Sequence, residues 1–411
     1  MKKLLIVLDG GCGRGVPSFG GRTVLECAHL PHLNFFVREG KMGHMYPLGE
    51  NIIPSSEQSV ICLLGNDYRL CKRGYYEAIG AGIKLKKGDL ALRTNFATID
   101  SLEKKNIIDR RAGRTITSRE ARLLAKEVSD SISLPYEFEF HATVQHRGVL
   151  VLRGLFSDKI SSVSSGWKGG EGSEKFEFCE PLSNDKLSRT SAEVVNDFIV
   201  QSHKILERSS INKKRKQQGL YPANIVLTRG ASAEIPRIKS YSKWLSLNCM
   251  PLEVGIARAS KMHNIACLMP EMNSSDIYAH LHKLLQLKCE HSIRSLEKHH
   301  ADFEGCYVHF KEMDNAGHDN KPHEKQKLLE EVDALFFKPL QKLAVKNKWK
   351  VVVTCDHATP CVLKGHSADP VPVLVYGEES DGSLEFSERE GMKGSLGKIY
   401  GKDFMKKTGL R

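Results

Sequence analysis

Residues 348–370 read KWKVVVTCDHATPCVLKGHSADP, and this stretch decides the fold that the sequence predicts. It opens with an apolar, β-branched run at 351–353, which is typical of a buried parallel strand. The run leads to Asp356 and His357, and His366 follows nine residues after His357. Ligands gather at the carboxyl ends of strands in open α/β sheets, so we expect these three side chains to line a site.

Two other apolar runs end in the same way. LLIVLDGG (4–11) stops at Asp9, and CYVHFKEMDNAGHD (306–319) reaches Asp314, with His318 four residues later. Taken singly, such an Asp is usually a helix cap or turn residue, and such a His is usually an ordinary surface or core residue. Asp-His, Asp-x-x-x-His and Gly-His together are more specific. They predict a two-metal centre, because carboxylate and imidazole suit Mn, Zn or Mg ions.

These motifs also belong to a longer pattern that resembles a known family. The chain is similar, nearly end to end, to the archaeal-type cofactor-independent phosphoglycerate mutases of the alkaline phosphatase superfamily. The similarity implies an α/β fold: an alkaline-phosphatase-like core with a mostly parallel sheet and helices on both faces, plus an inserted α+β domain. The shared stretches are RGYYEAIGAGIKLKKGDLALRTNFATID (73–100), DRRAGR (109–114), HRGVLVLRG (146–154), ANIVLTRG (223–230), PLEVGIARA (251–259), DNAGHD (314–319) and DHATP with KGHSADPVPVL (356–374).

The resemblance implies which residues hold the metal ions. We expect two divalent ions, with Mn favoured and Mg or Zn possible, and no bisphosphoglycerate cofactor. By family role, one ion is held by Asp9, Ser56, Asp356 and His357, and the other by Asp314, His318 and His366.

Ser56, in IIPSSEQSVICLLG (52–65), matches the family's nucleophile. At the start of a helix the dipole would favour a phosphate there. The alternative is that Ser55 or Ser56 only caps the helix. The chain also departs from the family here: the archaeal pattern is Ser-Asp-Thr-Ala-His, and Val60 stands in place of the His.

The order of predicted elements divides the chain into three segments. Residues 1–75 and 236–411 form the two parts of a metal-binding, phosphatase-like domain, and residues 76–235 form an inserted substrate-clamp domain. In the insert we predict strands at 89–100, 138–145, 146–154 and 223–230 and helices at 116–132 and 191–208, which indicate an α+β unit. Elsewhere we predict helices at 23–40 and 275–298. The segment 322–347 is predicted to be a crossover that leaves the strands on either side of it parallel.

Basic residues in the insert suggest a clamp for an acidic ligand, because arginine's planar fork matches carboxylate and phosphate. A single surface Arg is normally only solvated, but several of these lie inside shared motifs. Lys243 falls about eight residues before Pro251, where the family has a ligand Lys, and an exposed Lys is an equal alternative. The cations noted are Arg110, Arg111, Arg114, His146, Arg147, Arg153 and Arg229; the resemblance assigns substrate binding to Asp109, Arg110, His146, Arg147, Arg153 and Arg229, with Lys243.

Charge, cysteine content and the length of apolar runs bear on partners and location. The 411 residues carry a net charge of +12. The densest basic cluster, 213–215, lies in a polar, linker-like stretch without aromatic neighbours or a nucleic-acid motif, so we interpret most of the excess charge as solvated surface and expect no nucleic-acid partner. Eleven scattered Cys fit a reducing compartment. The apolar run near the start is too short for a signal peptide, and no run is long enough to span a membrane. We therefore expect a cytoplasmic protein; no oligomeric state is indicated.

The function expected from the resemblance is interconversion of 3-phosphoglycerate and 2-phosphoglycerate through a phosphoserine. Two alternatives stay open. A plain metallophosphatase would keep the metal ligands and release phosphate to water. A catalytically impaired relative would bind ligand without turnover, and Val60 with the altered context of Lys243 would favour it.

Overall fold

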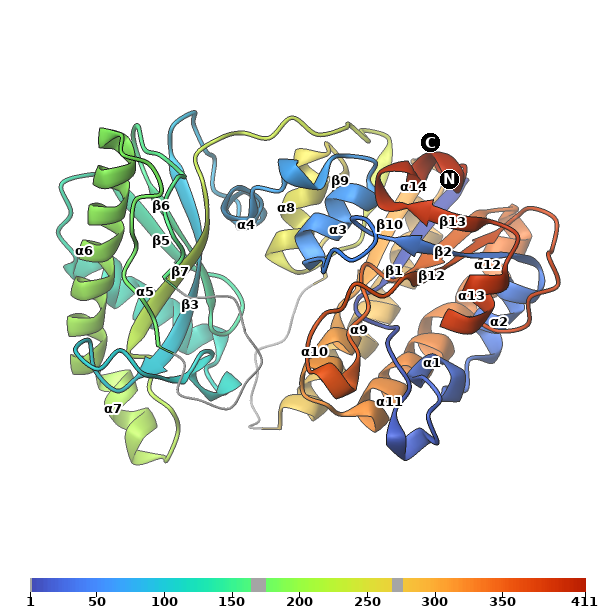
Figure 1. Ribbon diagram of the computed structural model, residues 1–411, viewed down its shortest axis with the longest axis horizontal. Helices are drawn as coiled ribbons and strands as arrows, with labels where there is room; N and C mark the ends of the chain where they lie inside the picture. The colour runs from blue at the N-terminus through green and yellow to red at the C-terminus, as the bar shows by residue number, and fades with distance from the viewer. Residues whose placement is uncertain (1, 164–174, 268–275) are drawn as a thin grey trace.

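The computed structural model describes residues 2–163, 175–267 and 276–411 and contains two β-sheets, each with its own hydrophobic core. Figure 1 shows them as two lobes, with helices α4 and α8 between them. The larger lobe contains both chain ends. The smaller lobe is made from the middle of the chain, as the predicted insertion requires.

The larger sheet has eight strands and is mostly parallel. The central strand β1 (Lys3–Leu8) pairs in parallel with β10 (Gly305–Phe310) on one side and β11 (Lys350–Thr354) on the other. These strands are buried along nearly their whole length, as expected for strands covered on both faces. The order is β13 (Gly397–Tyr400), β2 (Gly40–Tyr46), β12 (Val371–Tyr376), β11, β1, β10, β8 (Trp244–Ser246) and β9 (His263–Asn264), with β12 antiparallel to β11 and β2.

The predicted crossover is confirmed, because the strands on either side of 322–347 are both parallel to β1. The predicted helix at 23–40 is wrong as a single element. It is two helices, α1 (Val24–Cys27) and α2 (Pro31–Arg38), because Pro31 disfavours helical backbone at Leu30. The other helices of this lobe are α3 (Ser56–Leu63), α8 (Pro251–Ala259), α9 (Ile277–His299), α10 (Glu312–His318), α11 (Pro322–Val332), a π-helix (Asp333–Phe337), α12 (Lys338–Asn347), α13 (Glu388–Lys393) and α14 (Phe404–Lys407).

The smaller sheet is antiparallel, in the order β4–β3–β6–β5, with β7 on β3. Leu92 and Phe96 of β3 pack in the core made with the covering helices, whereas Ala91 packs with Ala78 of α4. This is the two-residue alternation of a strand. The elements are β3 (Leu90–Ile99), β4 (Ile107–Asp109), α5 (Ser118–Ser131), β5 (Phe138–Ala142), β6 (Arg147–Leu152), α6 (Lys186–Arg208), α7 (Ser210–Gln217) and β7 (Ile225–Ser232).

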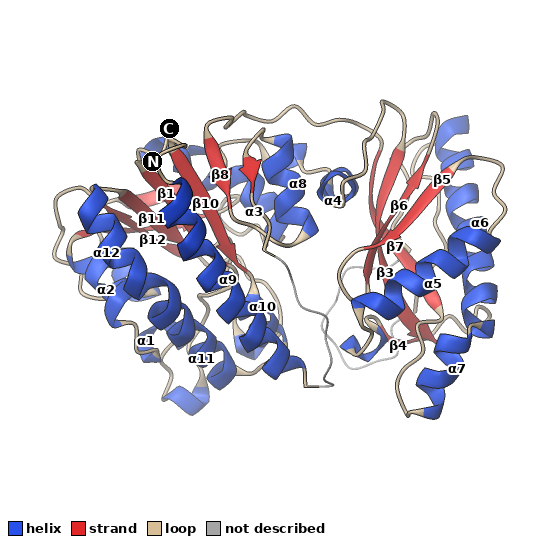
Figure 2. Cartoon of the chain, turned by 180° about the vertical axis from the view of Figure 1, so that it is seen from behind, coloured by secondary structure: helices blue, strands red, loops and turns tan. Residues whose placement is uncertain are grey.

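Helix α4 (Arg73–Gly80) packs against both lobes, between the antiparallel sheet and α8 (Figure 2). The contact is close enough to require glycine. A Cβ on Gly80 would lie 1.8 Å from the carbonyl oxygen of Pro251, and one on Gly255 would lie 1.8 Å from that of Tyr76. Because α4 joins both lobes, the domain limits at 76 and 235 stay predictions.

The basic cluster 213–215, predicted in a linker-like stretch, lies on helix α7 and is only partly exposed. Arg215 is 1 % exposed and binds the loop that follows β4, whereas Lys213 and Lys214 are exposed. Among the described residues, no helix is both long enough and apolar enough to cross a membrane. Short 3₁₀ turns occur at Pro17–Phe19, Tyr68–Leu70, Ala112–Arg114, Cys361–Leu363 and Gly401–Asp403.

Candidate active site

The three acid-bearing strands lie side by side, in the order β11, β1, β10, and run parallel. Their carboxyl ends therefore bring Asp9, Asp314 and Asp356 to one edge of the sheet. Asp314 and His318 lie four residues apart on α10, so they share one face of that helix. His366 comes from the loop after β11. The structure thus gathers the metal-type side chains that the sequence predicted.

One cluster consists of Asp314, His318 and His366. The Nε2 atoms of His318 and His366 lie 3.5 and 3.4 Å from Oδ1 of Asp314. The other ring nitrogen of each His donates to a main-chain carbonyl, at Lys364 (3.0 Å) and Pro54 (2.7 Å). These hydrogen bonds leave both Nε2 lone pairs facing the same carboxylate, which is the arrangement that orients histidine ligands.

A second cluster is centred on Asp9. Nε2 of His357 lies 3.4 Å from Oδ1 of Asp9 and 3.2 Å from Oδ2 of Asp356. Asp9, Asp356 and His357 are completely buried, and Asp9 Oδ1 and Asp356 Oδ2 lack a hydrogen-bond partner. Buried carboxylate oxygens normally have one. The orphaned oxygens and the donor types fit a divalent ion. Three groups of described residues have the spacing to hold one: Asp314 with His318 and His366, Asp9 with Asp314 and His357, and Asp9 with His309 and Asp356.

The pKa values of the residues in this second cluster are shifted by burial and by their charged neighbours. Burial and the neighbouring carboxylate of Asp9 raise the pKa of Asp356 well above its ordinary value. Burial alone would raise the pKa of Asp9 as well, but the ammonium of Lys311 lowers it. Burial lowers the pKa of His357 and so favours the neutral ring, the form that binds metals. Carboxyl groups crowded in this way are stabilised by added positive charge.

Ser56 is the first residue of α3, and its hydroxyl faces the second cluster. Its Oγ lies 3.1 Å from Nε2 of His357 and 3.4 Å from Nζ of Lys311. The preceding residue carries the capping interactions: the backbone N–H and the hydroxyl of Ser55 both donate to Oε1 of Gln58. The Ser56 hydroxyl is therefore not needed for capping and points to the site. Val60 is buried in the hydrophobic core and is not among the described residues that line the cavity at the site.

The smaller lobe supplies the opposite wall. Arg93 pairs across the sheet with Arg229, and Asn95 pairs with Arg147, so strand alternation turns their side chains to one face. That face, Ser56 and the cluster of Asp314, His318 and His366 border one cavity of about 760 Å³. The described residues that line it include Ser56, Arg73, Arg93, Arg110, Arg111, His146, Arg147, Arg229, Glu253, Lys311, Asp314, His318 and His366.

The cations of this wall crowd one another. Burial, with Arg114 and Arg147 nearby, lowers the pKa of Arg111 to about 9, and burial with Arg73 lowers that of Arg229 to about 10. Nη1 of Arg93 and Nε of Arg229 are buried without a hydrogen-bond partner. Arg73, in contrast, has an acidic partner: its Nη1 donates to Oε2 of Glu57 at 2.6 Å. Guanidinium groups held in this way suit an anion carrying several oxygens.

Three predicted substrate residues are not brought to the cavity. Asp109 accepts from the backbone N–H groups of Arg111 (2.7 Å) and Gly113 (2.8 Å), so it shapes the loop that bears the arginines. Arg153 pairs with Asp89 and Glu139 on the insert. Lys243 pairs with Glu304, and it precedes β8, which is parallel to β10; it therefore lies at the amino-terminal edge of the sheet, opposite the clusters.

Sequence reasoning missed His309 and Lys311. Nε2 of His309 lies 2.9 Å from Oδ2 of Asp9, and its Nδ1 lies 2.7 Å from the hydroxyl of Tyr307. Lys311 contacts Asp9 and Ser56 and lies 3.5 Å from Glu253. A His within the apolar strand GCYVHF and a Lys at its end were the available signals, since β10 adjoins β1.

The chain is similar to known proteins of one family. A family model described as 2,3-bisphosphoglycerate-independent phosphoglycerate mutase matches residues 37–212. The chain is 34 % identical to the protein of that name from Thermococcus kodakarensis, over 98 % of this chain and 95 % of that one. It is 32 % identical to the one from Methanopyrus kandleri, over 97 % and 94 %.

Two solved structures are similar over nearly the whole chain. A Pyrococcus horikoshii protein superposes with a TM-score of 0.76 at 26 % identity, covering 100 % of this chain and 98 % of that one. The cofactor-independent phosphoglycerate mutase from Thermoplasma acidophilum has a TM-score of 0.57 at 28 % identity, covering 99 % and 98 %.

Proposed function

Because the chain belongs to the family of 2,3-bisphosphoglycerate-independent phosphoglycerate mutases, we propose that it interconverts 3-phosphoglycerate and 2-phosphoglycerate. The observation that carries the proposal is a single cavity with two complementary walls. One wall presents Ser56 beside two metal-type clusters, and the other presents an arginine-rich sheet face. A phosphorylated, carboxylated three-carbon acid offers an anion to each wall.

Asp314, His318 and His366 would hold one divalent ion, and Asp9, Asp356 and His357, with Ser56, would hold the other. Two such ions neutralise charge on the oxygens of a transferring phosphoryl group and favour ionisation of the hydroxyl that attacks it. Mn²⁺ suits the mixed nitrogen and oxygen donors, and Mg²⁺ or Zn²⁺ are the other candidates. His309, on Asp9, orients one of these carboxylates.

The chain's own groups then divide the work. Ser56 attacks the phosphorus of 3-phosphoglycerate, the bond to the substrate's C3 oxygen breaks, and that oxygen gains a proton. The ammonium of Lys311, 3.4 Å from the Ser56 Oγ, stabilises negative charge on the serine oxygen. The glycerate formed keeps its carboxylate and is retained by the cationic wall. Its C2 hydroxyl then takes the phosphoryl group from Ser56, which regenerates the serine.

The clamp we propose consists of His146, Arg147, Arg229 and Arg110, together with Arg93 and Arg111, which the sequence analysis did not assign to substrate. Burial lowers the pKa of His146 well below its ordinary value, so its ring is neutral and can exchange donor and acceptor roles as the glycerate turns. We assign Asp109 to loop shape and leave Arg153 and Lys243 out of the clamp.

The test is a mutase assay coupled to enolase, run on enzyme stripped with chelator and then reloaded. We expect stripping to abolish turnover and Mn²⁺ to restore it, since three carboxylates converge there. Free phosphate is measured in parallel, with free labelled glycerate present. Phosphate release without 2-phosphoglycerate would identify a phosphatase instead. Full activity after exhaustive metal removal would contradict the two-metal assignment, and a folded, metal-loaded but inactive protein would identify an impaired relative.

A further inference from the structure

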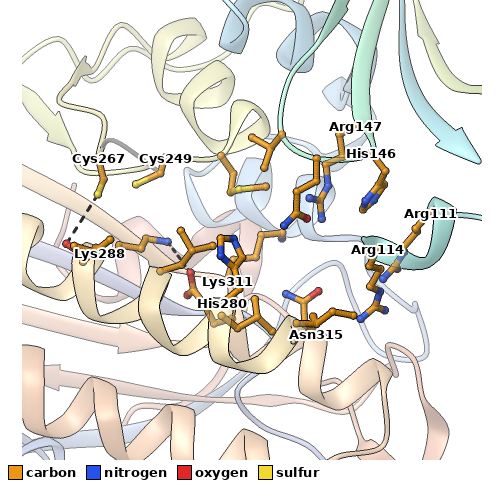
Figure 3. Close-up of a pocket in the computed structure, with 18 residues that line it drawn as sticks. Arg111, Arg114, His146, Arg147, Cys249, Cys267, His280, Lys288, Lys311 and Asn315 are labelled. Carbon is orange, nitrogen blue, oxygen red and sulfur yellow. Dashed lines mark hydrogen bonds and ion pairs between the residues drawn. The ribbon is translucent and has the colours of Figure 1, made fainter. Parts of the chain in front are cut away.

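Two cysteines meet at one end of a second, more enclosed cavity beside the proposed catalytic one. Cys249 lies between β8 and α8, and Cys267 follows β9. Both thiols line this cavity, and each lies close enough to shift the pKa of the other; the Cys267 thiol also lies 3.9 Å from the carbonyl oxygen of Leu287. Figure 3 shows both sulfur atoms at the end of the cavity nearest Lys288, with Lys311 and Arg147 farther along it.

The two sulfurs are chemically different. The contact with Cys267 and the ammonium of Lys288 lower the pKa of Cys249 to about 7, against the effect of burial. The same contact raises the pKa of Cys267. Lys288 lies on α9, and its Nζ is 3.9 Å from Oε1 of Glu312. This ion pair keeps the ammonium group beside the two cysteines. One cysteine is therefore suited to react as a thiolate, and its neighbour is already in position to respond.

This pair differs from a second one in the same protein. Cys12 and Cys355 are also neighbours, but both are fully buried, and burial raises the pKa of Cys12 well above its ordinary value. Cys249 and Cys267 are only partly buried. Reactivity of a thiol requires both thiolate character and access, so the two features favour the pair at 249 and 267.

We propose that Cys249 and Cys267 form a peroxide-sensitive dithiol site that closes to a disulfide and lowers the activity of the adjoining cavity. The Cys249 thiolate attacks one peroxide oxygen, the O–O bond breaks, and a sulfenic acid and water form. The sulfur of Cys267 then attacks that sulfenic sulfur, the S–O bond breaks, and a second water leaves. The two thiols lose two electrons and two protons in total, and peroxide is reduced to two waters.

Disulfide formation would act on the catalytic cavity through α8. The sulfurs must move from non-bonded contact to a bond of about 2.05 Å, which shifts the turn that contains Cys249. Met250 and Pro251, the next two residues, line the catalytic cavity. Glu253, in the first turn of the same helix, lies 3.5 Å from Lys311. The effect on activity rests on the proposed mutase function, whereas the disulfide itself does not.

The experiment exposes the reduced, Mn²⁺-loaded full chain to increasing hydrogen peroxide. After alkylation and digestion, mass spectrometry measures the linked peptides, and the enolase-coupled assay measures turnover. We expect a linkage between Cys249 and Cys267 and a fall in kcat/KM of about fivefold or more, both reversed by dithiothreitol. Cys249→Ser and Cys267→Ser should abolish the linkage and the reversible loss. Cys27→Ser, at a partly buried thiol in α1, should respond to peroxide as the unmodified chain does.

The linkage is measured on the unmodified chain, so the site can be tested even if a Ser variant does not fold. Absence of the linkage, or an activity loss that follows a Cys12–Cys355 linkage instead, would overturn the site. A complete Cys249–Cys267 disulfide with unchanged turnover would overturn its coupling to the cavity. A reduced protein without mutase activity would count against the proposed function, and the linked peptides would still report on the thiol pair.

Discussion

The two sheets present their functional side chains in different ways. The parallel sheet does so at its edge, where β1, β10 and β11 end beside one another and bring Asp9, Asp314 and Asp356 together. The antiparallel sheet uses its face, where alternation turns Arg93 and Arg147 the same way. The edge of a parallel sheet brings together residues that come just after its strands. The face of an antiparallel sheet brings together residues that lie within its strands. The cavity lies where the edge of one sheet meets the face of the other.

The two walls are also opposite in charge, and each is unfavourable alone. Burial and the nearby carboxylate of Asp9 raise the pKa of Asp356 on the acidic side, and burial with the neighbouring arginines lowers that of Arg111 to about 9 on the basic side. Lys311 lies between them, and its contact with Asp9, against the effect of burial, helps to raise its own pKa. Metal cations bound at the acidic wall and an anionic substrate bound at the basic wall would offset the unfavourable charge of each wall. We therefore expect binding at the two walls to be coupled.

Replacing the acidic wall's nucleophile should have the largest effect. Ser56→Ala removes the hydroxyl that lies 3.1 Å from Nε2 of His357 and keeps the basic wall intact. We expect kcat to fall by about 10³-fold or more, with no phosphoserine after mixing with 3-phosphoglycerate, while substrate still binds. Rapid quench with phosphopeptide mapping checks this.

The neighbouring serine is the matched control for that change. Ser55→Ala deletes a hydroxyl that donates to Gln58 in the cap of α3, so we expect stability to fall by about 1 kcal/mol while phosphoserine still forms at Ser56. Wild-type turnover in Ser56→Ala would refute the nucleophile and, with it, the family role given to this position.

On the basic wall, Arg147→Ala should raise KM for 3-phosphoglycerate by roughly 10- to 100-fold, the loss expected for hydrogen bonds to a charged group. Melting temperature should change little, because Arg147 faces the cavity and burial lowers its pKa. Arg153→Ala is the control from the end of the same strand. Its guanidinium already binds Asp89 and Glu139, so it should lower melting temperature and leave KM unchanged. The reverse pattern would mean that the two arginines have been assigned the wrong roles.

A smaller effect is expected from replacing Arg215, which contacts the loop that bears the arginines of the basic wall. Ala112, Gly113 and Arg114 have φ of 47°, 70° and 56°, a strained run that shapes the arginine loop. Arg215 holds it by donating to the Ala112 carbonyl (3.3 Å) and to Oγ1 of Thr115 (2.8 Å). Arg215→Lys cannot keep both contacts, so we expect KM to rise several-fold with kcat nearly constant.

Its exposed neighbour offers a clean comparison. Lys213→Ala removes a cation from the same helix without touching the loop, and both kinetic constants should match the unmodified chain. A fall in melting temperature alone for Arg215→Lys, with KM unchanged, would show that Arg215 is structural and does not position the loop.

The contrast between edge and face also explains what sequence could predict. An apolar run followed by an acid marks a strand end, and parallel order brings such ends together, so the edge set around Asp356 could be predicted before its geometry was known. The face could not be predicted as well. Arg147 and Arg153 lie on one strand and its end, and only tertiary packing decides that Arg153 meets Asp89 while Arg147 faces the cavity. His309 was missed because a single His inside an apolar strand is a weak signal, which an ordinary core histidine gives as well.

The smallest expected effect concerns Lys243, which the family spacing assigned to substrate. Parallel pairing of β8 with β10 fixes its position: it comes just before Trp244, which pairs with Gly305, so it lies at the edge where the strands begin. Its Nζ binds Oε1 of Glu304 at 2.8 Å in an exposed pair, and such pairs contribute little. Lys243→Ala should therefore leave kcat, KM and melting temperature unchanged within error, in contrast to Arg147→Ala under the same assay. A rise in KM comparable to that of Arg147→Ala would require Lys243 to reach substrate from the opposite end of the sheet, and would show that the parallel edge alone does not define the acidic wall.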